Sequence, residues 1–209
     1  MTRVRGLFGA ATTATQIPEP PIARFLFADT RMAAVWLLLR VYVGWQWLQA
    51  GLEKLESPAW VGANAGAALS GFVAGALKKT TGEHPDVTGW YAAFLQGFVL
   101  PNAAVWSHLV TFGEILIGLG LIFGCLTGVA AFFGGFMNAA YLFAGTVSVN
   151  PLLFVLATWL VLAWRVAGFI GLDFVVLPIL GTPWAPGRLV RHPAPPMPIP
   201  IPAAAGSEV

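Results

Sequence analysis

GEILIGLGLIFG, residues 113–124, holds one charged side chain, Glu114, among apolar residues and glycines. The apolar run around it, at about residues 102–123, is long enough to cross a bilayer, because a helix rises 1.5 Å per residue against ~30 Å of hydrocarbon. A carboxylate is costly at that depth, so it should face neighbouring helices and have a partner there. The stretch therefore predicts a membrane-spanning helix that belongs to a bundle.

The composition of the whole chain supports a membrane protein. Of its 209 residues, 57% are hydrophobic and only 10% are charged, and the mean hydropathy is +0.76. A soluble domain needs far less apolar surface. Charge-poor runs of spanning length occur four times, at about residues 32–52, 102–123, 126–147 and 152–177. The predicted fold is all-α, a polytopic four-helix transmembrane bundle.

Three parts of the chain follow from these runs. An N-terminal tail, residues 1–31, precedes the transmembrane domain at residues 32–182, and a tail rich in proline follows at residues 183–209. That last segment cannot pack a core, and we expect an extended arm that either docks a partner or stays mobile.

The long loop at residues 53–101 separates the first two spans. Its segments NAGAALSGFVAGALKK and WYAAFLQGFVLPN are apolar and compatible with helix, so two short helices are expected over the outer mouth of the bundle. The two tails carry six arginines, whereas the loop carries three lysines that acidic residues offset. The positive-inside bias therefore predicts that both termini are cytoplasmic.

The sequence brings no evident redox group of its own. A single cysteine, Cys125, cannot form a dithiol relay, and three histidines with only one near a span exclude a bis-histidine haem. No cysteine cluster, nucleotide loop or group of metal ligands occurs. Haem, flavin, iron–sulfur and metal sites are therefore not predicted, and neither is nucleic-acid binding.

Four polar residues fall at similar depth in the four predicted spans. Helix rise places Arg40, Glu114 and Arg165 at ~10–18 Å from the inner side of the membrane, with Asn138 at ~18 Å. Two arginines against one glutamate leave an excess positive charge, which would attract an anion. The alternative is structural: Glu114 bridges helices while the spare arginine binds carbonyls or lipid phosphate.

A polar stripe climbs the first span toward the loop. Tyr42, Gln46, Gln49 and Glu53 share one helix face. Lys54 lies at its outer end, and His108 on the second span could face it. The stripe is either a polar route to the buried layer or a set of interhelical hydrogen bonds. The tryptophans nearby are either interfacial anchors or the walls of a quinone cleft.

Sequence motifs in all four spans resemble the DoxX/DoxD family of small membrane proteins. The resemblance runs from about residue 33 to residue 184 and includes RVYVGWQWLQAGLEKLESPAW, LPNAAVWSHLVTFGEILIGLGLIFGCLTG and LAWRVAGFIGLDFVVLPILGTPW. It matches the family patterns R-x-x-x-G, G-x-x-K, G-E, N-P and A-W-R at Arg40, Gly44, Gly51, Lys54, Gly113, Glu114, Asn150, Pro151 and Arg165. The resemblance implies a four-helix fold in a prokaryotic cell membrane.

Some members of that family resemble the membrane subunit of thiosulfate:quinone oxidoreductase. This implies an enzyme subunit in which Arg40, Arg165 and Lys54 hold a small sulfur anion and electrons pass to quinone. Glu114 or His108 would then handle the quinone protons, with polar support from Gln46, Gln49, Asn138 and Glu53. A second protein subunit would supply the missing redox chemistry. The alternative is an accessory subunit that anchors a larger respiratory or photosynthetic membrane complex.

Overall fold

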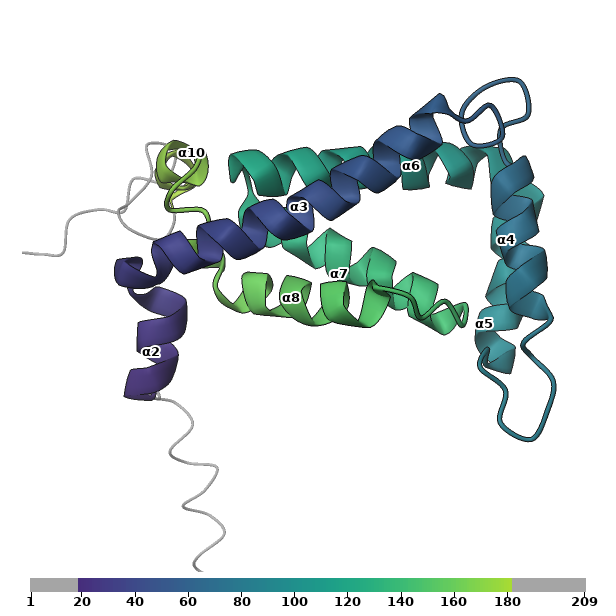
Figure 1. Cartoon of the computed structure of the whole chain (residues 1–209), viewed down its shortest axis with the longest axis horizontal. Helices are drawn as coiled ribbons and strands as arrows, with labels where there is room; N and C mark the ends of the chain where they lie inside the picture. Colours follow the sequence, from purple (N-terminus) through teal and green to yellow (C-terminus); the bar gives the residue numbers. More distant parts are fainter. Residues whose placement is uncertain (1–18, 182–209) are drawn as a thin grey trace, which may run out of the picture.

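Four long helices form the body of the molecule (Figure 1). The computed structural model describes residues 19–181, and its elements there are all helical. The long helices are α3 (Ala33–Glu56), α6 (Ala103–Phe123), α7 (Thr127–Phe143) and α8 (Asn150–Leu162). The all-α expectation is therefore confirmed for the described part of the chain.

Close glycine contacts join α3 and α6 as an antiparallel pair. A Cβ added at Gly118 would lie 2.6 Å from the backbone nitrogen of Leu48, and one at Gly51 would lie 2.7 Å from Cγ1 of Ile115. Glycine at these positions lets the two backbones approach closely, as is common between membrane helices. The pairing sets the register of the bundle, because Gly51 lies beside Glu114 and Gly44 lies beside Leu121.

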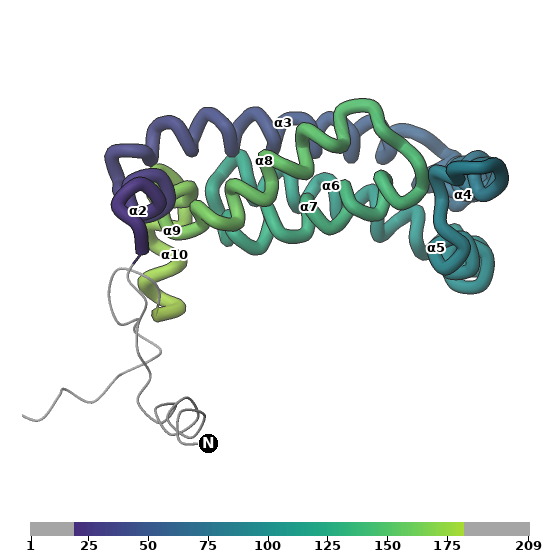
Figure 2. The backbone as a smooth tube through the Cα atoms, turned by 90° about the horizontal axis from the view of Figure 1, so that it is seen from below, coloured from purple at the N-terminus to yellow at the C-terminus, as the bar shows by residue number. Residues whose placement is uncertain are grey.

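The loop between α3 and α6 folds into short helices at one end of the bundle (Figure 2). The two predicted loop helices are present as α4 (Ala67–Leu77) and α5 (Gly89–Phe94). A π-helical turn, η2 (Leu95–Val99), and a 3-10 turn, η3 (Leu100–Asn102), lead from α5 into α6. These helices have their own core, which includes Val73, Val87 and Tyr91.

Two side chains tie this end of the molecule to α7. Lys79 Nζ donates to the Gly145 carbonyl at 2.6 Å, and the Tyr91 hydroxyl donates to the Ala140 carbonyl at 2.8 Å. Both acceptors lie at the C-terminal end of α7, which is where a cation is favourable. The loop helices are therefore fixed over the end of the bundle.

The opposite end holds α2 (Pro21–Ala28), η1 (Thr30–Met32), α9 (Trp164–Ala167) and α10 (Asp173–Leu180). Helix α2 was not predicted, since its residues were assigned to the N-terminal tail. Trp36 Nε1 donates to the Leu26 carbonyl at 2.7 Å and joins α2 to α3.

The prediction of one continuous helix over residues 152–177 is wrong. Helix α8 ends at Leu162, and the chain turns twice before α10 begins at Asp173. The break allows Leu172 and Asp173 to donate backbone hydrogen bonds to the carbonyls of Phe123 and Gly124, at 3.0 and 2.7 Å. Contacts with the turn after α6 therefore replace the helical bonds that a continuous span would have made.

One helical run in the described residues, Gly89–Phe123, is long and apolar enough to cross a membrane, with a mean hydropathy of 1.6 over an 18-residue window. It passes from α5 through the π-helical and 3-10 turns into α6. Helices α7 and α8 are shorter, with 17 and 13 residues. The number of crossings thus stays a prediction. The predicted proline-rich tail lies outside the described residues.

Candidate functional site

A pocket of about 370 Å³ opens inside the bundle at the end covered by α4. Its walls come from α3, α4, α6, α7 and the start of α8. Four of its side chains are large aromatic rings: Trp47, Trp60, Phe72 and Tyr141. Its polar lining consists of Gln46, Lys54, Glu114, Asn138, Thr146, Ser148 and Asn150. The walls of the pocket are therefore largely aromatic, with polar side chains at a few positions.

Glu114 lies in this pocket with two partners. Lys54 Nζ lies 2.8 Å from its Oε2 in an ion pair, and the Tyr141 hydroxyl donates to its Oε1 at 2.7 Å. The Glu114 side chain is 1% exposed, and that of Lys54 is 19% exposed. A buried carboxylate is stable only when it is paired in this way. Each oxygen of Glu114 is thus held by a different helix.

Lys54 links the buried carboxylate to the mouth of the pocket. Its ammonium group lies 5.1 Å from the centre of the Trp60 ring, within the range of a cation–π contact. The same Nζ donates weakly to the Ala50 carbonyl at 3.4 Å. Lys54 can therefore donate a hydrogen bond to a ligand while it keeps Glu114 paired.

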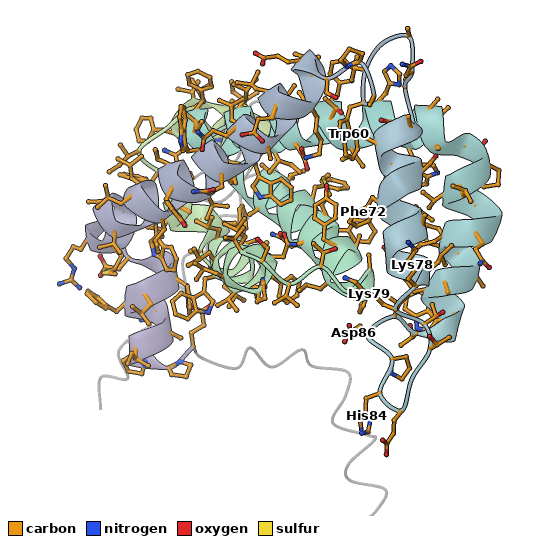
Figure 3. All side chains as sticks on the ribbon, turned by 45° about the vertical axis from the view of Figure 1, so that its right-hand side comes forward. Trp60, Phe72, Lys78, Lys79, His84 and Asp86 are labelled. Atoms are coloured by element: carbon orange, nitrogen blue, oxygen red, sulfur yellow. The ribbon has the colours of Figure 1, made fainter. Side chains whose placement is uncertain are left out.

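The aromatic rings pack around Tyr141. Trp47 stacks on it with centroids 6.5 Å apart, and Phe72 meets it edge-on at 6.0 Å. Trp60 and Phe72 project from the loop and from α4 toward the bundle, and Lys79 lies farther along the same segment (Figure 3). Such flat walls suit a planar ring better than a flexible chain.

Two further polar groups in the pocket have no hydrogen-bond partner among the described residues. Asn138 is fully buried, and neither its Oδ1 nor its Nδ2 is bonded. Trp47 Nε1 is buried and unbonded as well. Buried polar atoms are nearly always satisfied, so these orphan groups point to something that binds in the pocket.

The predicted layer of Arg40, Glu114 and Arg165 is wrong. In the observed register Arg40 lies beside Gly124, at the far end of α6 from Glu114. It is 1% exposed, donates to the Ile170 carbonyl at 2.8 Å, and interacts electrostatically with Asp173. Helix α3 extends past the end of α6, so equal counts from the predicted span ends do not give equal depths.

Arg165 and His108 also lie away from the pocket. Arg165 is on the short helix α9 and pairs with Glu19 at 3.1 Å, with its side chain 38% exposed. His108 Nδ1 lies 2.7 Å from the Ala104 carbonyl, and its ring stacks on Phe112. Neither residue lines the pocket, so the structure brings neither of them to Glu114.

The predicted polar stripe on α3 is only partly directed inward. Gln46 lines the pocket, whereas Tyr42, Gln49 and Glu53 are exposed. The four residues share one face within about 60° of arc, and Gln46 lies at the edge of that face nearest the pocket. Of the sequence-predicted site residues, the pocket therefore brings together Lys54, Glu114, Gln46 and Asn138.

Sequence reasoning missed Tyr141, Trp60 and Phe72 in the pocket. Tyr141 follows Asn138 by three residues, so it shares that residue's helix face, and this spacing could have identified it. Trp60 and Phe72 lie in the loop, and no periodicity connects them with the spans.

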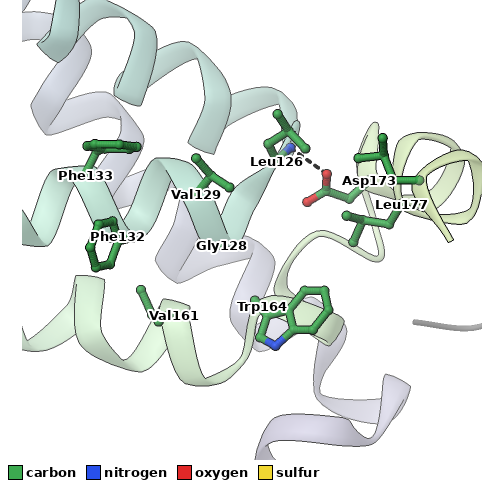
Figure 4. Close-up of a pocket in the computed structure, with 10 residues that line it drawn as sticks. Leu126, Gly128, Val129, Phe132, Phe133, Val161, Trp164, Asp173 and Leu177 are labelled. Atoms are coloured by element: carbon green, nitrogen blue, oxygen red, sulfur yellow. Dashed lines mark hydrogen bonds between the residues drawn. The ribbon is translucent and has the colours of Figure 1, made fainter. Parts of the chain in front are cut away.

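Asp173 was missed as well, although it interrupts an apolar run just as Glu114 does. Its carboxylate accepts a hydrogen bond from the backbone nitrogen of Leu126 at 2.6 Å (Figure 4). It accepts a second one from the backbone nitrogen of Thr127 at 2.9 Å. It thus caps the N-terminus of α7 from another element. The pocket of about 560 Å³ beside it is otherwise lined by apolar residues of α7 to α10. Both oxygens of this carboxylate are engaged in capping.

The described residues contain no group of three metal-ligating side chains. The comparison with curated proteins found no match, and neither did the comparison with solved structures. A family model, DoxX, matches residues 35–146. The match covers α3 to α7 and includes the pocket residues Lys54, Glu114, Asn138 and Tyr141. Since it spans more than half of the chain, the protein belongs to the DoxX family of membrane proteins.

Proposed function

We propose that this protein is the membrane subunit of a quinone-linked oxidoreductase, and that the ring of the quinone binds in the pocket around Glu114. The observation that carries the proposal is the buried Lys54–Glu114–Tyr141 network inside an aromatic pocket. A quinone ring needs flat walls, a donor for its oxygen and groups that carry protons during reduction. The pocket offers all three.

The charge of the pocket favours a neutral ligand. Lys54 and Glu114 offset each other, and the two arginines expected to create a positive site lie elsewhere. A dianion such as thiosulfate would meet no excess positive charge here. The pocket therefore suits the quinone, and the oxidation of the sulfur anion belongs to a partner subunit.

The resemblance to thiosulfate:quinone oxidoreductase subunits implies a two-electron reaction. Two thiosulfate ions joined by a sulfur–sulfur bond give one tetrathionate and release two electrons. One quinone takes up those two electrons and two protons and becomes a quinol. Lys54 would donate a hydrogen bond to the ring oxygen nearest the mouth, and Glu114 with Tyr141 would relay a proton to it.

We also infer that α3, α6, α7 and α8 cross a prokaryotic cell membrane, with both termini in the cytoplasm. Helix α3 has 24 residues, about 36 Å at 1.5 Å each, which exceeds the hydrocarbon thickness. The outward faces of all four helices carry large apolar side chains, among them Leu38, Leu116, Phe136 and Leu162, which are 53–73% exposed. Lipid is the solvent that such faces require.

Binding of a quinone analogue to the purified protein tests the proposal. We expect duroquinone to bind in detergent, as measured by calorimetry, and Glu114→Gln to weaken it at least tenfold, because Lys54 then loses its charged partner. Glu19→Gln, which removes an exposed carboxylate paired with Arg165, is the matched control and should bind as the wild type does.

The same proteins then test catalysis with the partner subunit present. Thiosulfate should reduce the quinone with wild type and with Glu19→Gln, and only slowly with Glu114→Gln. Wild-type protein that binds no quinone at all would contradict the proposal and would favour the accessory, anchoring role.

A further inference from the structure

Asn138 is the most unusual polar residue of the molecule. It is 0% exposed, it lines the pocket, and both polar atoms of its side chain lack a partner among the described residues. Leaving a donor and an acceptor buried without bonds costs free energy, so a purely structural asparagine at this place would destabilise the fold. A ligand that binds Asn138 would satisfy both polar atoms and offset this cost in free energy.

Trp47 presents a second unbonded donor to the same region. Gly134 and Asn138 are four residues apart on α7 and share a face, as does Tyr141. A Cβ at Gly134 would lie 3.1 Å from Trp47 Nε1, so the indole nitrogen reaches the surface of α7 one turn before Asn138. The two orphan donors therefore lie on adjoining walls of the pocket.

These donors lie deeper than Lys54. Trp47 precedes Lys54 by seven residues on α3, which is about 10 Å along the helix axis. On α7, Asn138 likewise precedes Tyr141. It is therefore farther than Tyr141 from the loop end, where Lys79 contacts Gly145. The pocket thus has one polar group, Lys54, near the loop helices and another, Asn138, farther from them, with aromatic rings in its walls.

We propose that Asn138, supported by Trp47, binds the second oxygen of the ring and so selects ligands that carry oxygen at both ends, that is, para-quinones and their quinols. The inference rests on the proposed quinone function and extends it to ligand selection. Asn138 Nδ2 donates to a carbonyl oxygen of the quinone, and its Oδ1 accepts from the hydroxyl of the quinol. One residue can therefore hold both redox states.

The selectivity follows because a buried polar group without a hydrogen bond costs more free energy than a formed hydrogen bond contributes. A ligand that lacks the second oxygen would leave Asn138 unpaired and would forgo one hydrogen bond. A single such bond changes affinity by about tenfold. We therefore expect duroquinone, with two ring oxygens, to bind about tenfold more tightly than durenol, which has the same methyl groups and one oxygen.

The variant Asn138→Leu tests the assignment because leucine has nearly the same shape without polar atoms. We expect it to bind duroquinone about tenfold more weakly, to bind durenol as the wild type does, and to melt at a higher temperature than wild type when no ligand is present. Asn64→Leu, an exposed position outside the pocket, is the matched control and should leave both affinities unchanged.

The possible results separate the two proposals. Wild-type protein that binds neither compound contradicts the quinone function itself. Wild-type protein that binds both equally, or Asn138→Leu that keeps the preference for duroquinone, overturns the role of Asn138 and leaves the function intact. If Asn138→Leu does not fold, Asn138→Ala takes its place. A lower melting temperature for both variants without ligand shows a structural role and also overturns the inference.

Discussion

The Lys54–Glu114 ion pair is the central polar contact of the pocket. Its two residues come from different helices, and the pair is stable only as long as both charges are present. Tyr141 donates a hydrogen bond to the other carboxylate oxygen, Oε1, so both oxygens of Glu114 have a close partner. The pair therefore orients Lys54, and Lys54 faces the pocket.

Lys54→Met should reveal how strongly the carboxylate depends on this cation. The substitution leaves a buried, negatively charged Glu114, and we expect a loss of about 3–5 kcal/mol in unfolding free energy, measured by denaturation in detergent. Adding Glu114→Gln removes the unpaired charge and should recover more than half of that loss. A double variant as unstable as Lys54→Met alone would contradict the pairing.

At the residue level, the sequence could predict that a carboxylate within a span needs a cation on another helix. It could not identify which cation, because depth was estimated from the ends of predicted spans. Arg40 and Lys54 are fourteen residues apart on α3. An error in the predicted span ends therefore assigns Arg40 in place of Lys54 as the partner of Glu114. Only the glycine contacts between α3 and α6 fix the register that pairs Glu114 with Lys54.

Among the described helices, α3 and α6 pack most closely against each other. The glycines on both helices let their backbones touch, and the pocket residues Lys54 and Glu114 project from these same two helices. The sequence supplies small residues for this approach at Gly44, Gly51 and Gly118. It did not predict the break between α8 and α10, because Gly168 and Gly171 are also tolerated within a membrane helix.

Gly118→Ala should therefore weaken both the fold and the site. The new methyl group would overlap the backbone of Leu48, so we expect a loss of about 1–3 kcal/mol in unfolding free energy and weaker quinone binding. Gly71→Ala on α4 is the matched control, since nothing lies within 4 Å of the added Cβ. It should stabilise the protein slightly, by up to about 1 kcal/mol, as alanine favours helix. Equal effects of the two changes would contradict the packing.

For the molecule as a whole, polar contacts fix the elements at each end. Arg40 ties the segment after α8 to α3, and Asp173 ties it to the start of α7. Lys79 ties the loop helices to the end of α7. The pocket lies at the loop end, near whichever side of the membrane the loop occupies. Under the proposed function, the orientation of the protein decides from which side protons and a partner subunit reach the quinone.

Cysteine labelling in intact cells should establish that orientation. With Cys125→Ala as background, single cysteines at His84 in the loop, at Glu19 before α2 and at Ser207 in the C-terminal tail report three positions. Four crossings with cytoplasmic termini predict that a membrane-impermeant maleimide labels only the loop position until the cells are permeabilised. Labelling of Glu19→Cys and Ser207→Cys but not of His84→Cys would show the opposite orientation in the membrane. Labelling of only one of the two terminal positions would require an odd number of crossings, and would contradict a bundle in which α3, α6, α7 and α8 all span the membrane.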